Sequence, residues 1–128
     1  ILLGTFALSA GYYDAYYIKA QKLQNLLRSQ FHNAFKTVDA IALPVTPTAA
    51  FKIGEMTNDP LQMYLNDVFT ISANLAGIPG ISIPGGFTRD QLPVGFQLLA
   101  GHLNEGKIIQ IAYNLESSLN LIKPSLAI

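Results

Sequence analysis

Asp67 is the residue whose surroundings most suggest a binding role. It is the one charged residue between Asp59 and Arg89, in a stretch otherwise made of apolar, amide, hydroxyl, proline and glycine residues. Such a carboxylate is either solvated at an exposed edge or buried against a cation, because burial without a partner is costly or forces protonation. The residues alone leave two readings open: an internal ion pair or backbone hydrogen bonds, or contact with a positively charged ligand.

Other candidate groups carry no recognisable motif. His32 and His102 are far apart in sequence and lack metal-ligand spacing, so we expect structural roles for both. Ser72 and Ser82 are not in a G-x-S-x-G turn, and we expect structural roles for them as well. The tyrosine-rich segment 11–17 has only two lysines nearby, which favours packing over the stacking of nucleic-acid bases.

The helix expected to position Asp67 has clear start and stop signals. Asp59 is a natural N-cap, Pro60 suits the first helical position, and Gln62 completes a capping box. Gly77 is a typical C-terminal stop. One apolar stripe is predicted to form the core face of this helix, consisting of Leu61, Tyr64, Leu65, Val68, Ile71 and Leu75. Asp67 borders that stripe, so we expect its carboxylate to be at least partly buried.

The remaining elements predict an α/β fold. Residues 12–36 are predicted to form a long helix whose apolar stripe is Leu23, Leu27, Phe31 and Phe35. Short strands are predicted over 40–43, 81–84 and 94–100, the last two joined by a surface loop. Asn104 is expected to cap a last helix that ends or breaks at Pro124, with its buried face formed by Ile108, Ile111, Ala112, Leu115 and Leu119.

Composition narrows the class of protein. The 128 residues have no net charge and no basic stripe, which argues against a nucleic-acid surface in this segment. There are no cysteines, which excludes disulfides, thiolate metal sites and a cysteine nucleophile within these residues. No signal peptide or membrane span is visible, so we expect no membrane partner. Only 12% of residues are charged, which indicates the interior-rich part of a larger protein.

Three motifs near Asp67 resemble the C-terminal part of the amidase signature family. These are ANLAG-x-P, a strand ending in Pro-x-G, and LP-x-G-x-Q. The segments LPVTPTAAFKIGE, DPLQMYLND and LGTFALSAGYYDAYYIKAQ resemble the glutamine-hydrolysing members that serve tRNA-dependent amidation. The resemblance covers nearly the whole chain. It implies that residues 1–128 are a single C-terminal portion of an amidase-signature domain, part of a mixed β-sheet flanked by helices, with the N-terminal catalytic part absent.

The resemblance also implies an activity. The full family member is a glutaminase with a Ser–cis-Ser–Lys triad, in which a neutral lysine acts as the base. Its ammonia amidates a misacylated glutamyl-tRNA(Gln) held by a partner subunit. The implied protein is cytoplasmic and belongs to a heterotrimer that uses ATP and Mg²⁺. No cofactor is expected on this segment, and no residue in it is expected to be catalytic.

The same resemblance implies a specific role for Asp67. The matching aspartate in MYLND binds the α-ammonium of glutamine, and the Thr46–Pro47 loop lies near that site. The arginine for the substrate carboxylate would come just before residue 1. Two alternatives remain open: a stand-alone amidase of the same family, and a noncatalytic module in which Asp67 pairs with a protein arginine. On the main interpretation, residues 1–128 alone are expected to be inactive.

Overall fold

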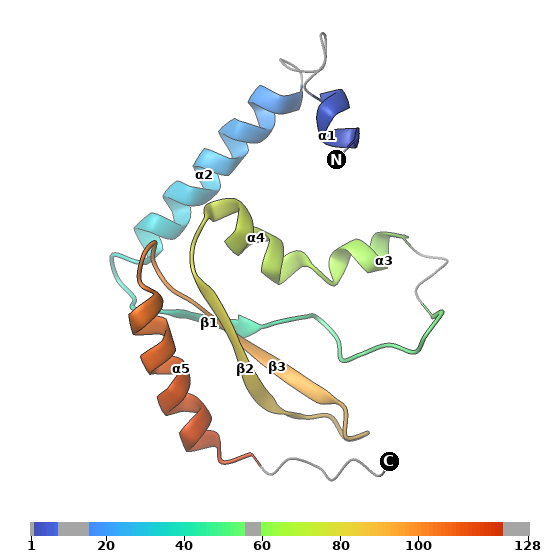
Figure 1. Cartoon of the computed structure of the whole chain (residues 1–128), viewed down its shortest axis with the longest axis vertical. Helices are drawn as coiled ribbons and strands as arrows, with labels where there is room; N and C mark the ends of the chain where they lie inside the picture. The colour runs from blue at the N-terminus through green and yellow to red at the C-terminus, as the bar shows by residue number, and fades with distance from the viewer. Residues whose placement is uncertain (1, 8–15, 56–59, 122–128) are drawn as a thin grey trace.

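The computed structural model describes residues 2–7, 16–55 and 60–121, and it confirms the α/β class (Figure 1). Helices lie on both sides of a small sheet. In chain order the elements are α1 (Leu2–Ala7), α2 (Ile18–Ala34), β1 (Ile41–Pro44), α3 (Pro60–Leu65), α4 (Val68–Ala76), β2 (Gly80–Phe87), β3 (Pro93–Leu99) and α5 (Glu105–Leu119). No helix in these ranges is long and apolar enough to cross a membrane.

The sheet has the order β1-β3-β2, and its three described strands all pair antiparallel. β2 and β3 form the predicted hairpin, and β1 lies on the other side of β3, where Ile41 pairs with Leu99. A register shift between Pro84 and Gly86 bends the outer end of β2. The predicted strand at 40–43 is thus confirmed with a shift of one residue. The hairpin strands are offset from the prediction by one to three residues at their ends.

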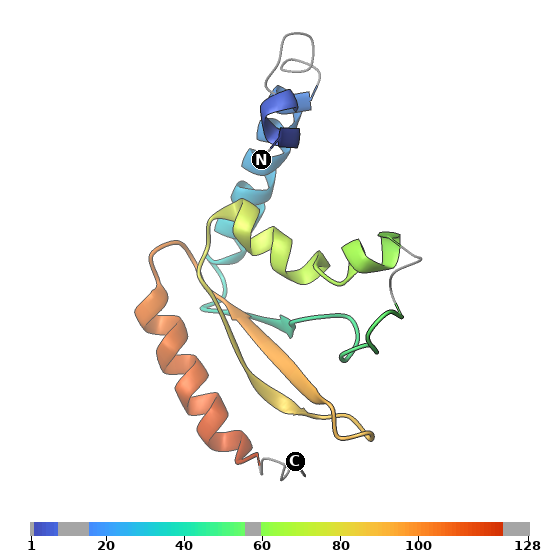
Figure 2. The ribbon, with the colours of Figure 1, turned by 45° about the vertical axis from the view of Figure 1, so that its right-hand side comes forward.

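The core lies between the hairpin and α5. Its buried residues are Ile83, Leu98, Ala100, Ile108 and Ala112, with Ile81, Phe96, Ile111 and Leu115 packed around them. Figures 1 and 2 both show α5 running along one side of the hairpin, with α4 on the side away from it. The predicted inner face of α5 is confirmed for Ile108 and Ala112, whereas Leu119 at its end is 38% exposed. Asn120, in the left-handed conformation, ends the helix before Pro124, which lies outside the described residues.

The prediction of a single helix that begins at Pro60 and stops at Gly77 is wrong, because the chain forms two helices. α3 ends at Leu65 and α4 begins at Val68, with Asp67 at φ −94° and ψ 1° between them. The Asp67 N–H bonds to the Tyr64 carbonyl three residues back, which tightens this turn. The predicted ends of this segment are confirmed where the structure describes them. Pro60 opens α3, and Gly77 ends α4 at φ +69°, a left-handed conformation that glycine adopts without strain; Asp59 lies outside the described residues.

The apolar stripe predicted as the core face of this segment is also wrong for this chain. All six of its side chains are exposed, from Tyr64 at 73% to Ile71 at 45%. α4 instead buries Ala73 and Ala76, which lie on a neighbouring arc. Phe69, Ala73 and Ala76 form a second apolar arc of α4 beside that of Val68, Ile71 and Leu75, so periodicity cannot select between these arcs. The two alanines permit a closer approach than the larger residues do.

α2 packs beside α4 and is only half-buried. The described helix begins at Ile18, so the predicted start at Tyr12 lies outside the described residues. Leu27, Phe31 and Phe35 of the predicted stripe are partly covered, and the Phe31 and Phe35 rings stack with centroids 6.2 Å apart. Leu23, nearer the start of the helix, is 59% exposed.

Candidate functional site

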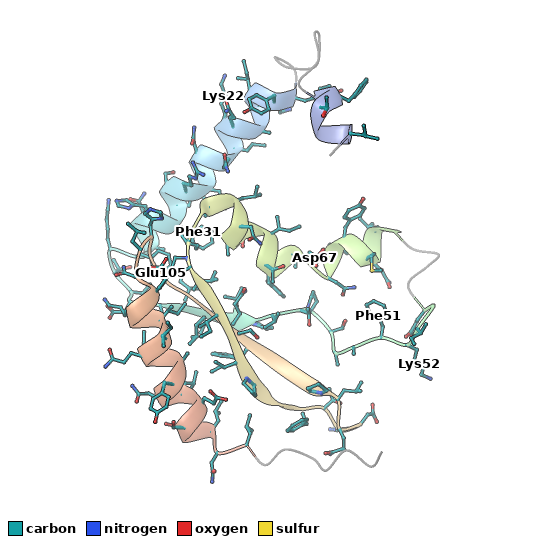
Figure 3. All side chains as sticks on the ribbon, viewed as in Figure 1. Lys22, Phe31, Phe51, Lys52, Asp67 and Glu105 are labelled. Atoms are coloured by element: carbon teal, nitrogen blue, oxygen red, sulfur yellow. The ribbon has the colours of Figure 1, made fainter. Side chains whose placement is uncertain are left out.

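Asp67 lies at the N-cap position of α4, and its side chain is exposed (Figure 3). The expectation of partial burial is therefore wrong for this chain. The break between α3 and α4 places Asp67 at a corner, where its backbone carbonyl accepts hydrogen bonds from the N–H groups of Thr70 and Ile71 at 3.0 Å. Its carboxylate makes no capping bond to α4 and forms no ion pair within the described residues. The carboxylate is thus available to a cation from outside this segment.

A cavity of about 270 Å³ borders the residue before Asp67. Its lining combines Asn66 with residues of the segment after β1, namely Thr46, Thr48, Ala49, Ala50 and Phe51. In Figure 3, Asp67 lies where α3 meets α4 and Phe51 lies on that second segment. The Thr46 hydroxyl donates to the Thr48 carbonyl at 2.7 Å, which holds the turn around Pro47. Thr46 and Asn66, the residue before Asp67, thus line the same cavity, and the proximity of this loop to a glutamine site stays a prediction.

Asn66 contributes an unsatisfied donor to this region. Its side-chain Nδ2 is buried and has no hydrogen-bond acceptor within the described part of the chain. A buried amide nitrogen without an acceptor costs about 1–3 kcal/mol. A buried donor without an acceptor in the described residues thus belongs to the residue before the exposed Asp67 carboxylate.

Gln97 holds α4 against the sheet. It is the one polar side chain buried among the described residues, and its Nε2 donates to the Phe69 carbonyl of α4 at 3.1 Å. Phe69 is two residues beyond Asp67, so this bond fixes the start of α4 relative to β3. Gln97 was not singled out from the sequence. The sequence signal that could have identified it is its position in β3, on the face of the strand opposite to that of Phe96 and Leu98. An amide buried on that face needs a hydrogen-bond partner.

Gly95 lets the segment after β1 approach β3. A Cβ atom at Gly95 would lie 2.8 Å from Val45 Cγ2 and 3.3 Å from Ser82 Oγ. The Val45 N–H also bonds to the Gly95 carbonyl at 3.3 Å. Gly95 and Gln97 are the glycine and glutamine of LP-x-G-x-Q. In this structure the motif positions the two segments that meet at the Asn66 cavity.

One of the candidate histidines and one of the candidate serines contact backbone carbonyls of the segment around α4. His102 Nδ1 lies 3.0 Å from the Gly77 carbonyl, and the Ser72 hydroxyl points to the Phe69 carbonyl at 3.4 Å. Ser82 is exposed on β2. His32 and His102 line one common cavity at the other end of α4. No local pattern in the sequence predicts this.

Comparisons with known proteins agree with this architecture. The family model described as Amidase matches residues 1–109. The chain is 54% identical over 128 residues to the A subunit of the glutamyl-tRNA(Gln) amidotransferase from Desulfosudis oleivorans, covering 98% of this chain and 26% of that protein. It is 57% identical over 123 residues to the protein of the same description from Syntrophus aciditrophicus, covering 96% of this chain and 25% of the relative.

Solved structures show the same likeness. The crystal structure of the glutamyl-tRNA(Gln) amidotransferase A subunit from Thermotoga maritima matches with a TM-score of 0.79 at 46% identity, over 91% of this chain and 25% of that one. A structure described as an amidase matches with a TM-score of 0.73 at 26% identity, over 91% of this chain and 27% of that one. The chain thus spans about a quarter of the length of the relatives it matches. With the family model matching most of its residues, the chain belongs to the amidase family.

Proposed function

We propose that this chain is part of the A subunit of a glutamyl-tRNA(Gln) amidotransferase. The support is identity above 50% to proteins of that description over nearly all of its residues. In this proposal the whole protein hydrolyses glutamine, and the ammonia released amidates glutamyl-tRNA(Gln) bound to a partner subunit. The other members of a cytoplasmic heterotrimer, with ATP and Mg²⁺, supply the remaining chemistry.

Asp67 is the proposed ligand of the α-ammonium of glutamine. The observation that carries this role is an exposed carboxylate without an ion-pair partner in the described residues, beside a cavity with an unsatisfied donor. A carboxylate and an ammonium form a charge-assisted hydrogen bond, which is roughly twice as strong as a neutral one. The apolar side chains of Val68, next to Asp67, and of Ile71, four residues after Asp67, are exposed. If further protein covers them, the bond forms in a less polar environment and becomes stronger.

The proposed division of labour assigns substrate recognition to this segment and bond cleavage to a Ser–cis-Ser–Lys triad elsewhere in the domain. We assign no catalytic role to Ser72, because it is half-buried and its hydroxyl points to a helix carbonyl. Ser82 has no lysine or histidine bonded to it in the described residues. The proposal therefore predicts no glutamine hydrolysis by residues 1–128 alone, and measurable hydrolysis by them would contradict it.

The test is Asp67→Asn in the whole polypeptide that carries these residues, assayed by ammonia release from glutamine. The change keeps size and shape but removes the charge that pairs with the ammonium. Loss of one charge-assisted hydrogen bond, about 1.5–3 kcal/mol, corresponds to a loss of glutamine affinity of roughly 10- to 100-fold. The matched control is Asp90→Asn, an exposed aspartate on the β2–β3 loop, which is expected to leave the affinity unchanged. Unchanged glutamine affinity in Asp67→Asn would remove the proposed role.

A second candidate, a stand-alone amidase, is favoured by the likeness to the solved amidase structure. A substrate comparison separates the two. If Asp67 binds an ammonium, Asp67→Asn weakens glutamine hydrolysis but leaves the hydrolysis of a simple amide without an ammonium group unaffected. A stand-alone amidase would hydrolyse the simple amide as well as glutamine and would show no stimulation by partner proteins.

If Asp67 instead pairs with a protein arginine, the Asp67→Asn substitution would weaken the association with the partners and leave glutamine affinity intact.

A further inference from the structure

A second cavity lies at the opposite end of α4 from Asp67. It has a volume of about 460 Å³ and is formed where α2, the end of α4 and the β3–α5 turn come together. The residues that matter here are Arg28, His32, Phe35, Gly77, Ile78 and His102. Its volume falls within the range of small-molecule sites, about 300–1,000 Å³. Gly77 lies ten positions after Asp67, about 15 Å at the helical rise, so the two sites are distinct.

The His102 ring has a defined orientation at this cavity. Its Nδ1 lies 3.0 Å from the Gly77 carbonyl oxygen, which can only accept a hydrogen bond. Nδ1 therefore carries the proton, and Nε2 on the other edge of the ring is left for another partner.

Arg28 brings a permanent charge to the same place. Its Nη2 would lie 4.0 Å from a Cβ atom at Gly77, so the guanidinium reaches the end of α4 beside the His102 bond. Within the described residues Arg28 has no carboxylate at ion-pair distance. No aspartate or glutamate of the described ranges lines the cavity either. The C-terminus of α4 contributes a partial negative charge of only about half a unit, which does not cancel the guanidinium.

The rest of the lining is apolar. Phe35 contributes from the end of α2, and Ile78 from the residue after Gly77. A ligand that fits would place an anionic head against Arg28 and an apolar body against these side chains. We propose that this cavity is a binding site for a small oxyanion carried on an apolar body. Carboxylates and phosphates share this chemistry, since arginine binds both through two parallel hydrogen bonds.

The test measures binding of three probes by titration calorimetry to the whole polypeptide that contains these residues. Benzoate and phenyl phosphate supply the two kinds of oxyanion on the same ring, and benzamide is the neutral counterpart. We expect at least one anion to bind and benzamide to bind at least roughly tenfold more weakly, because it cannot form the charge-assisted bonds. The better anion identifies whether the site prefers a carboxylate or a phosphate. Equal binding of benzamide, or no binding of either anion, would overturn the proposal.

Variants locate the binding. Arg28→Gln is expected to weaken the binding of the preferred anion by roughly tenfold or more. His32→Ala and His102→Gln are expected to weaken it by less. Arg89→Gln is the matched control, because Arg89 is an exposed arginine on the β2–β3 loop. Arg28 is itself exposed, so its replacement is not expected to unfold the protein. Equal anion affinity in Arg28→Gln and Arg89→Gln would contradict the assignment. Asp67→Asn should leave anion binding unchanged, which keeps this test separate from that of the proposed function.

Discussion

Gln97 and Phe69 join the central strand to the helix that begins beside Asp67. The Gln97 Nε2 donates to the Phe69 carbonyl oxygen at 3.1 Å, and Gln97 is only 7% exposed. A hydrogen bond from a buried side chain to a helix carbonyl restricts both the position and the direction of that helix. The glutamine of the LP-x-G-x-Q motif therefore orients α4, and with it the corner that presents the Asp67 carboxylate.

Replacing Gln97 with leucine should destabilise the protein. The change conserves approximate volume but removes the donor to the Phe69 carbonyl, and we expect a loss of roughly 1 kcal/mol in the free energy of unfolding. Urea denaturation followed by circular dichroism measures this loss. Gln110→Leu on the exposed side of α5 is the control and should leave the midpoint nearly unchanged. Equal midpoints for the two variants would show that the Gln97 bond contributes nothing to stability.

Gly95→Ala should be destabilising because the added methyl group meets the Val45 side chain at 2.8 Å. Valine is branched at Cβ and has little rotational freedom to relieve the contact. Overpacking of this kind costs about 1–3 kcal/mol. Gly106→Ala in α5 meets no atom within 4 Å and should be neutral or stabilise the helix by up to about 1 kcal/mol. A Gly95→Ala protein as stable as Gly106→Ala would show that Val45 can move aside.

The Asp39–Lys107 pair should give a small stability change at acidic pH. The hydrogen bond from the Lys107 ammonium, with its charge, lowers the pKa of Asp39 below the ordinary value. A lowered folded-state pKa contributes stability that is present above the unfolded-state pKa and is lost as the pH falls through the folded-state pKa. The effect should be small and weakened by salt, because both side chains are largely exposed, at 47% and 78%.

Lys107→Met tests this pair. Titration of the Asp39 carboxyl by NMR should show its pKa rising toward the ordinary value for aspartate. Lys36→Met is the control, since the Lys36 ammonium bonds to the Asn33 amide oxygen and to no carboxylate in the described residues. If Lys107→Met leaves the Asp39 pKa lowered, another cation must be responsible.

The exposed stripe on α4 should promote self-association when residues 1–128 are produced alone. Val68, Ile71 and Leu75 share one face of α4 and are 45–48% exposed. Contiguous apolar surface of this kind favours association in water. Ile71→Gln is expected to reduce the apparent mass in sedimentation velocity. Ile109→Gln removes a similarly exposed isoleucine from α5, at 57%, and should have the smaller effect. Equal effects would mean that association does not involve the α4 face.

Several features of the fold follow from local sequence alone. Gly77 ends α4 because its left-handed conformation carries no penalty in glycine, whatever packs around it. The hairpin follows from two apolar runs separated by a short polar loop, and the inner face of α5 follows from its helical period. In each case the determining interaction spans only a few residues.

The features that required tertiary structure depend on contacts between distant segments. Asp67 stands out in the sequence, but its exposure depends on the break at Asn66 and on which arc of α4 faces the sheet. That choice follows from the packing of Ala73 and Ala76 and from the Gln97 bond. Similarly, His32 and His102 have no relationship in the sequence. They line one cavity because α2 crosses the end of α4 beside the β3–α5 turn. Local spacing identifies such residues, whereas only the packing of helices and strands decides what each one faces.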